Sequence, residues 1–307
     1  MTNHPTGPAA RERVLTKDDI HQFDALARAG VVFRQYGPSL QPPWYARHRQ
    51  LPAKFETPEA AEDEDYKRVK MLIADGSPAA CRLATLIDPC RLAGPYPTLA
   101  SSRYYRWARV RFVAGVDHWL RQHPDETLHA FTLIPPAAFA EAGGLHDPQY
   151  GAPRLRARFR KHFDLLGLDP ADGWLIGGLH ASFEQGHTER LTGYQFHMHG
   201  LCNAAMIPTI EALRATSSYA KTPRVHGPIQ TEPVSQVEPW VTYMAQSYWP
   251  QRNALGLLLP GSRVRSRSRL PKPHHTEMLI WLHQQRFGDL VMMRGGNIPE
   301  WARRHVW

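Results

Sequence analysis

The stretch YQFHMHGLCNAAM, residues 194–206, decides the fold because it reads as a strand and lies close behind a second such segment. That partner is DGWLIGGLHASFEQ, residues 172–185, and the polar segment GHTERLTG separates the two. The pattern predicts an antiparallel hairpin with a long loop. Side chains alternate along a strand, so His197 and His199 share one face, while Phe196 and Met198 point to the opposite face, towards a core.

The segments around this hairpin alternate between strand and helix patterns. Strands are predicted at 127–136 and 225–234, and helices at 153–168, 207–215 and 235–249. The order strand, helix, strand, strand, helix, strand, helix predicts an α+β fold with a central, mainly antiparallel sheet and flanking helices. No Gly-rich phosphate loop occurs in the sequence, so an NTPase site is not supported.

The regions on either side of this core have a different character. A charged, then amphipathic segment predicts a helix ending near Gly76, and a long basic helix is expected up to His123. The segment 81–97 is mixed and broken by prolines, and the first 60 residues are rich in Pro and Gly. We therefore divide the chain into an N-terminal accessory region (1–95), a core (96–252) and a basic C-terminal region (253–307).

Composition limits the class of protein and its partners. The 307 residues carry a formal net charge of +9, and the sequence pI is about 9.6, which favours a polyanionic partner such as nucleic acid. The three cysteines are few and odd in number, so we expect a reducing, cytoplasmic environment rather than a disulfide framework. No apolar run is long enough to span a membrane, and the first residues lack an apolar signal core.

The two histidines of the HMH stretch are candidate metal ligands. Neutral imidazoles side by side offer nitrogen lone pairs that can share one ion. A third ligand is expected from the neighbouring strand, where His180 and Glu184 both fall on the same face. With 17 histidines in the chain, a chance pair in a half-buried strand is the alternative.

The helix expected at 235–249 offers a candidate nucleophile. Its core-facing stripe consists of Val237, Trp240, Val241, Met244 and Tyr248. Tyr243 lies beside this stripe, where its hydroxyl could reach towards the sheet, although packing alone would also explain a tyrosine there. Tyr248 would point about 140° away from Tyr243 on a helix, which favours the use of a single tyrosine.

Three short motifs, taken in order, resemble those of HUH endonucleases, specifically the replication initiators of rolling-circle plasmids and phages. HAFTLIPP (129–136) resembles the first motif, FHMHGL (196–201) the histidine motif, and YMAQSYW (243–249) the helical Tyr-x-x-Lys motif. The similarity covers residues 129–252, and it implies that the core at 96–252 is an HUH-type nuclease. Gln246 stands where the family has lysine, and Ile134 replaces the second threonine of the first motif.

The resemblance implies a chemistry and a set of roles. Tyr243 would be the nucleophile, and His197 and His199 would hold Mg²⁺ or Mn²⁺ together with Glu184 or, in another alignment, His180. The implied reaction is nicking of single-stranded DNA at an origin through a covalent 5′-phosphotyrosine, followed by rejoining. The implied partners are single-stranded or cruciform origin DNA and a host helicase and polymerase, with no membrane involved.

Basic segments with interleaved aromatic residues are candidate tracks for the DNA strand. They lie at 102–112, 153–163 and 263–272. The third is expected to be an unstructured basic stretch, whose candidate DNA-binding residues are Arg263, Arg265, Arg267, Arg269 and Lys272. Each track has a simpler interpretation as a solvated helix face or a flexible tail.

Other readings of the same residues remain open. A transposase or mobilisation relaxase would use the same core and cleavage chemistry. A DNA-binding relative that has lost its activity is favoured by Gln246. A metalloenzyme unrelated to DNA is a further possibility, since HxH also occurs in β-barrel enzymes.

Overall fold

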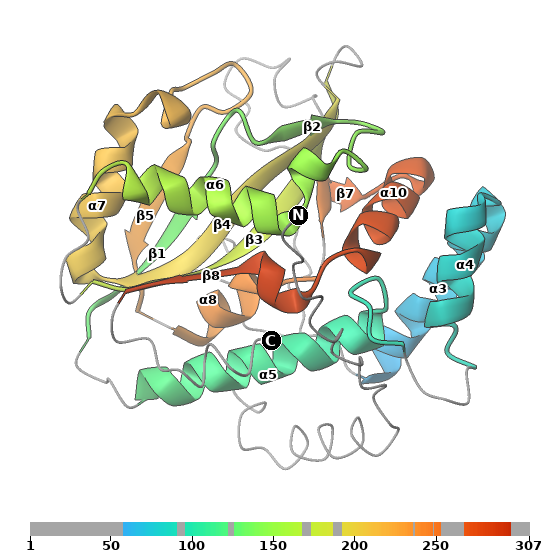
Figure 1. Ribbon diagram of the computed structural model, residues 1–307. Helices are drawn as coiled ribbons and strands as arrows, with labels where there is room; N and C mark the ends of the chain where they lie inside the picture. The colour runs from blue at the N-terminus through green and yellow to red at the C-terminus, as the bar shows by residue number, and fades with distance from the viewer. Residues whose placement is uncertain are drawn as a thin grey trace, which may run out of the picture.

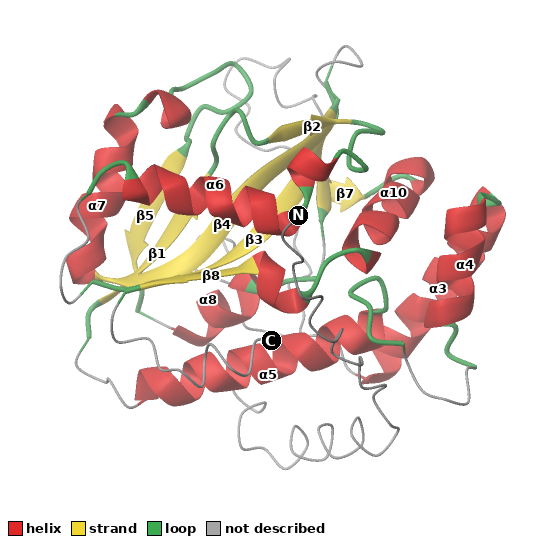
Figure 2. Ribbon diagram, viewed as in Figure 1, coloured by secondary structure: helices red, strands yellow, loops and turns green. Residues whose placement is uncertain are grey.

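A central sheet with helices on both faces forms the body of the protein (Figure 1). The computed structural model describes residues 58–90, 96–121, 126–167, 173–186, 192–235, 237–247, 249–252 and 267–295. The helices of eight or more residues, coloured red in Figure 2 with the shorter ones, are α3 (Pro58–Asp75), α4 (Pro78–Ile87), α5 (Ser102–Arg121), α6 (Ala152–Asp164), α8 (Val237–Met244) and α10 (Lys272–His283). The six-residue α7 (Ile207–Ala212) follows the second strand of the hairpin.

The sheet has eight strands in the part of the chain that is described. They are β1 (Leu128–Leu133), β2 (Phe139–Glu141), β3 (Leu175–Glu184), β4 (Gly193–Asn203), β5 (Ile229–Pro233), β6 (Pro250–Arg252), β7 (Arg267–Arg269) and β8 (Val291–Arg294). The order is β5-β1-β4-β3-β6-β7, with β2 added to β4 and β8 added to β3. All pairs are antiparallel except β3 with β6. The predicted α+β fold with a mainly antiparallel sheet is confirmed.

The predicted hairpin is the centre of this sheet. β3 pairs with β4 over its full length, from Leu175 opposite Cys202 to Glu184 opposite Gly193. The two strands are buried on both faces. They are therefore the most protected part of the fold, and side chains on either face are held away from water.

One face of the sheet carries the main apolar core. Phe196 packs against Trp281 of α10 and Trp249, with ring centroids 5.7 and 5.8 Å apart, and Tyr150 stacks on it just before α6. Figure 1 shows α6 crossing in front of the sheet, with α5 and α8 below it. The opposite face bears His197 and is covered by α8, which in turn contacts α5.

The flanking regions depart from expectation in two places. The mixed segment after residue 81 is partly helical, because α4 begins with Ser77 as its N-cap, accepting from the Ala80 amide at 3.3 Å, and with Pro78 in its first turn. The sheet also does not end at the expected boundary after residue 252, since β7 pairs with β6 and β8 pairs with β3.

None of the described helices combines the length and the apolar character required to cross a membrane. All three cysteines are free thiols, with Cys81 and Cys90 exposed and Cys202 buried.

Candidate active site

Three histidines meet on the face of the sheet below α8. His180 on β3 lies directly opposite His197 on β4, and His199 lies two residues further along β4 with Gly178 opposite it. The ring centroids are 4.6 Å apart for His197 and His199, 5.3 Å for His180 and His199, and 6.0 Å for His180 and His197. All three side chains are buried, so their ring nitrogens contact other protein groups and not bulk water.

Backbone carbonyls set the orientation of two of these rings. Nδ1 of His197 lies 3.0 Å from the carbonyl oxygen of Gln195, and Nε2 of His180 lies 2.7 Å from that of Met244. A carbonyl only accepts, so each of these nitrogens carries the hydrogen and the other ring nitrogen bears the lone pair. Nδ1 of His180 is buried and has no hydrogen-bond partner. Burial lowers the pKa of His180 to about 4, which keeps this ring neutral near pH 7.

Tyr243 reaches the third histidine. Its hydroxyl lies 3.0 Å from Nε2 of His199, and Nδ1 of His199 lies 2.8 Å from the hydroxyl of Thr132 on β1. With the hydrogen on Nδ1, His199 donates to Thr132 and accepts from Tyr243. A tyrosine hydroxyl, an imidazole that can accept its proton and a threonine that orients the imidazole thus form one chain of hydrogen bonds. This is the arrangement that an activated nucleophile requires. Tyr248, the other tyrosine considered, lies outside the described residues.

The end of α8 is fixed by residues that the sheet and α5 supply. The last carbonyls of a helix have no partner within the helix. Here the Met244 carbonyl accepts from His180, and the Thr242 carbonyl accepts from Arg109 of α5 at 3.3 Å. Gly178 makes the approach possible, because a Cβ at this position would lie 1.7 Å from the Met244 carbonyl oxygen. The positive charge of Arg109 also suits a helix C-terminus.

α8 is shorter than expected and corrects the interpretation of the third motif. The helix ends at Met244 rather than near residue 249, and a turn follows in which the Gln246 amide donates to the Tyr243 carbonyl at 3.1 Å. The Gln246 carbonyl accepts from the Tyr105 hydroxyl at 3.4 Å. Gln246 therefore does not continue the helix, and spacing along a helix does not determine its relation to Tyr243.

Glu184 is not brought to the histidines. It pairs with Gly193 at the far end of the hairpin, four residues from His180, which is roughly 13 Å along the strand. There it accepts from the Ser182 hydroxyl at 2.8 Å and lies 3.6 Å from Arg252. Of the two residues expected as a third ligand, the geometry unites only His180 with the pair. Alternation along the strand predicted the correct face for both residues. Their different distances from the histidine pair depend on the register of the hairpin.

The spacing and the anchoring of the three histidine rings determine whether they fit a divalent ion. Metal–nitrogen distances of about 2.0–2.1 Å place rings that share an ion about 5 Å apart, close to the observed spacing. Carbonyl anchoring of the second ring nitrogen, as in His180 and His197, is the usual support of a metal-binding histidine. Among the described residues, no three His, Cys, Asp or Glu side chains already converge on one point. The group fits an ion once Nε2 of His199 exchanges its contact with Tyr243.

The expected basic tail is only partly described. Arg263 and Arg265 lie outside the described residues, and Arg267 belongs to β7. Arg269 forms an ion pair with Glu64 of α3, and Lys272 is exposed at the start of α10. The unstructured stretch expected at 263–272 is therefore wrong for residues 267–269 and for Lys272, because strand pairing and a helix order them.

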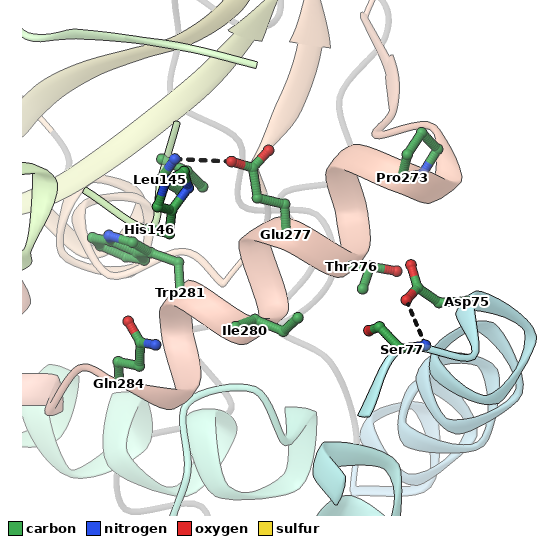
Figure 3. A pocket seen from close by; sticks show the side chains of 10 residues that line it. All are labelled: Asp75, Ser77, Leu145, His146, Pro273, Thr276, Glu277, Ile280, Trp281 and Gln284. Atoms are coloured by element: carbon green, nitrogen blue, oxygen red, sulfur yellow. Dashed lines mark hydrogen bonds between the residues drawn. The ribbon is translucent and has the colours of Figure 1, made fainter. Parts of the chain in front are cut away.

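One pocket in the described part of the protein lies away from the histidines, and another adjoins them. A pocket of about 260 Å³ lies between α10 and the start of α4, with Glu277 and Trp281 in its wall (Figure 3). Glu277 there accepts from the Leu145 amide at 2.8 Å. Trp281 packs on the Phe196 face of the sheet, so this pocket lies away from the histidines. A second pocket, of about 230 Å³, lies between β1, β5 and α8 and includes Thr132.

Sequence reasoning missed three residues that complete the site. Arg109 was visible only as one of many arginines in a basic helix, and Thr132 only as the first threonine of the HAFTLIPP motif, with no role assigned to it. Trp240 was assigned to the core stripe, and it is buried, yet its ring centroid also lies 6.0 Å from that of Tyr243. The available signal for Thr132 was its place in the HAFTLIPP motif. In the structure it lies directly opposite His199 in the β1–β4 pair, so the two side chains share a face.

Comparison of the chain with protein-family models, with curated proteins and with solved structures finds no match.

Proposed function

We propose that the protein is a metal-dependent DNA endonuclease that nicks one strand by attack of Tyr243 and later rejoins it. The observation that carries the proposal is the 3.0 Å contact between the Tyr243 hydroxyl and Nε2 of His199, within a buried group of three histidines. A tyrosine hydroxyl is a weak nucleophile at its ordinary pKa, and a neighbouring base or metal ion activates it.

The reaction exchanges one phosphoester bond for another and needs no ATP. The Tyr243 oxygen attacks the phosphorus as its proton leaves, the bond from phosphorus to the 3′ oxygen breaks, and that oxygen is released as a free hydroxyl after taking up a proton. The enzyme then carries a 5′-phosphotyrosine. Reversal of the same steps rejoins the strand. Because rejoining needs no ATP, the proposed reaction agrees with a sequence that contains no Gly-rich phosphate loop.

The histidines suit a resident divalent cation. His180, His197 and His199 would hold it, with Nε2 of His199 released from the Tyr243 hydroxyl. When bound, it would polarise the non-bridging oxygens of the phosphate and replace His199 as the group that activates the tyrosine. An all-imidazole set favours Mn²⁺ over Mg²⁺, which prefers oxygen ligands. The chain itself contributes a neutral ring at His180, since burial lowers the pKa of this side chain to about 4.

Arg109 would provide a fixed positive charge close to Tyr243 and His180. Its side chain is buried and donates to the carbonyl of the residue preceding Tyr243. Its charge also acts on His180, where it contributes to the lowered pKa. A guanidinium positioned before the reaction stabilises the charge that develops on a transferring phosphoryl group. We therefore assign to Arg109 the support of the transition state.

The biological role is proposed as initiation of rolling-circle replication. The net charge of +9 supports binding of a DNA strand, and the free 3′-hydroxyl would prime a host polymerase after a host helicase opens the duplex. A transposase or relaxase built on the same chemistry is the alternative role. The proposed site of action is the cytoplasm.

A second candidate is a DNA-binding relative without activity. It is favoured by the burial of Tyr243, only 3% of which is exposed, and by a glutamine at position 246. An active enzyme must admit a phosphate to this buried hydroxyl, whereas an inactive relative keeps it as packing.

Cleavage of pooled single-stranded oligonucleotides in Mn²⁺ separates the two candidates. Protein–DNA adducts on a denaturing gel are expected for the wild type and absent for Tyr243→Phe. Thr242→Val is the matched control, since it alters the neighbouring residue on α8 without touching the tyrosine hydroxyl. Adducts that persist in Tyr243→Phe would remove Tyr243 as the nucleophile. DNA binding without any adduct would favour the inactive relative.

A further inference from the structure

We propose that the pocket between β1, β5 and α8 receives one base of the DNA strand, and that it selects a base with an exocyclic amino group. The inference rests on the proposed function, because it names the part of the substrate that lies next to the phosphate attacked by Tyr243. The pocket has a volume of about 230 Å³ and is lined by Ala130, Phe131, Thr132, Gln230, Thr231, Glu232 and Trp240.

The pocket adjoins the reacting group through two of its own walls. Thr132 lines the pocket and contacts Nδ1 of His199 at 2.8 Å. Trp240 lines it as well, and its ring centroid lies 6.0 Å from that of Tyr243. A group bound in the pocket is therefore separated from His199 only by Thr132 and from Tyr243 only by Trp240. In single-stranded DNA, a base adjoining the scissile phosphate lies at such a distance.

The strand register turns the polar residues of β5 towards the same face as the histidines. Thr132 pairs with His199 on one side and with Gln230 on the other, so all three side chains share a face. Glu232 is two residues further along β5, opposite Ala130, and shares that face too. The pocket thus opens on the histidine face, at the edge strand of the sheet.

The size of the pocket limits what it holds. Its volume of about 230 Å³ is below the roughly 300–1,000 Å³ that accommodate complete drug-sized ligands. A single heterocyclic base matches this space better than a whole nucleotide does. Trp240 supplies the aromatic wall against which such a base packs, as bases do in single-strand binding proteins.

The charge of the pocket decides which part of the nucleotide enters it. Glu232 repels a phosphate, so in a basic protein the group admitted here is the neutral base. A carboxylate accepts from an exocyclic amino group such as N4 of cytosine, and a glutamine side chain pairs with adenine. Thymine has no such amino group. Gln230 and Glu232 together therefore favour adenine, cytosine or guanine over thymine.

The test uses the full-length protein and a pool of single-stranded oligonucleotides randomised at every position. Adducts formed in Mn²⁺ are isolated and both DNA fragments are sequenced, which gives base preferences around the cleaved bond. For the wild type, thymine is expected to be depleted several-fold at one position beside that bond. In Glu232→Gln and Gln230→Ala, this depletion is expected to fall at that position alone.

The matched control is Glu141→Gln on β2, which removes the same charge at an exposed carboxylate outside the pocket. β2 pairs with β4 at the Gly193 end of the hairpin, away from β5. This variant should keep the wild-type preference. An unchanged preference in both pocket variants, with normal adduct yield, would overturn the proposal while leaving the tyrosine nuclease intact.

A second measurement separates the pocket from the cleavage reaction. Tyr243→Phe protein is incubated with the same pool without metal, and the bound oligonucleotides are sequenced after filter retention. A thymine bias that Glu232→Gln removes supports the pocket even if the wild type forms no adduct, in which case only the proposed function fails. Absence of any bias in the bound pool and in the adducts overturns the pocket. Far-UV circular dichroism confirms that each variant is folded, and Glu232→Ala, which also removes the carboxylate, replaces Glu232→Gln if it is not.

Discussion

Replacement of Gly178 by alanine should separate the end of α8 from the histidines. The new Cβ would lie 1.7 Å from the Met244 carbonyl oxygen, where ordinary contact begins at 3.4 Å, so the carbonyl would have to retreat by about 1.7 Å. Such a movement breaks the 2.7 Å hydrogen bond from His180 and strains the 3.0 Å contact of Tyr243 with His199. Each buried hydrogen bond lost leaves unsatisfied groups that cost roughly 1–3 kcal/mol.

We expect Gly178→Ala to lower the free energy of unfolding by about 2–5 kcal/mol, which still leaves a folded protein if its stability is typical at roughly 5–15 kcal/mol. Gly177→Ala is the control, because its Cβ would meet the side chain of Met198, at 2.7 Å from the sulfur, on the opposite face. A flexible methionine can move aside, so a cost of about 1–2 kcal/mol is expected.

Urea denaturation followed by circular dichroism measures both changes, and the adduct assay measures their effect on the site. Gly178→Ala should lose adduct formation in the folded state, and Gly177→Ala should retain it. Equal destabilisation of the two variants, or wild-type adduct yield in Gly178→Ala, would refute the inference that the close approach of α8 builds the site.

Three further predictions concern charge, protons and metal. Arg109→Lys should keep adduct formation within about tenfold, since it retains the charge, whereas Arg109→Gln should lower it by about a hundredfold, or about 2.7 kcal/mol, in single-turnover assays. Burial, and then the charges of Arg68 and Arg269, lower the pKa of His275 from 6.5 to about 3. Between pH 3 and pH 6.5, His275 therefore binds a proton in the unfolded chain but not in the folded protein. The free energy of unfolding should fall as the pH falls below 6.5, by about 2 kcal/mol at pH 5. Urea titrations at several pH values should show a weaker pH dependence for His275→Gln. His197→Ala should weaken Mn²⁺ binding at least tenfold by calorimetry, and undiminished binding would place the ion elsewhere.

The sequence was sufficient for the centre of the sheet because the signals there are local. Alternation along the HMH stretch set the face of His197 and His199, and the polar loop indicated an antiparallel partner. The same alternation put His180 and Glu184 on the correct face. It does not supply the register of the hairpin, which places His180 opposite His197 and Glu184 at the other end.

Elements that depend on tertiary contacts were missed or misjudged. β6 and β7 have three residues each and β8 has four, too few for a period to be recognised. α8 was expected to run to residue 249, but its last carbonyls are satisfied by His180 and Arg109, so the helix ends where those partners lie. α4 was different, because the Ser77–Pro78 signal at its start was readable and was overlooked.

A pair of glycines in the sequence contains the information that local patterns lacked. Gly177 and Gly178 interrupt a buried strand, and glycine in a strand interior marks a place where another backbone approaches closely. Gly178 lies opposite His199, so the approaching backbone must end beside the histidine pair. The approaching backbone is the last residue of α8, Met244, and Tyr243 is the residue next to it. The position of Tyr243 beside the histidines is therefore explained by the missing side chain at Gly178, more directly than by the helical stripe of α8.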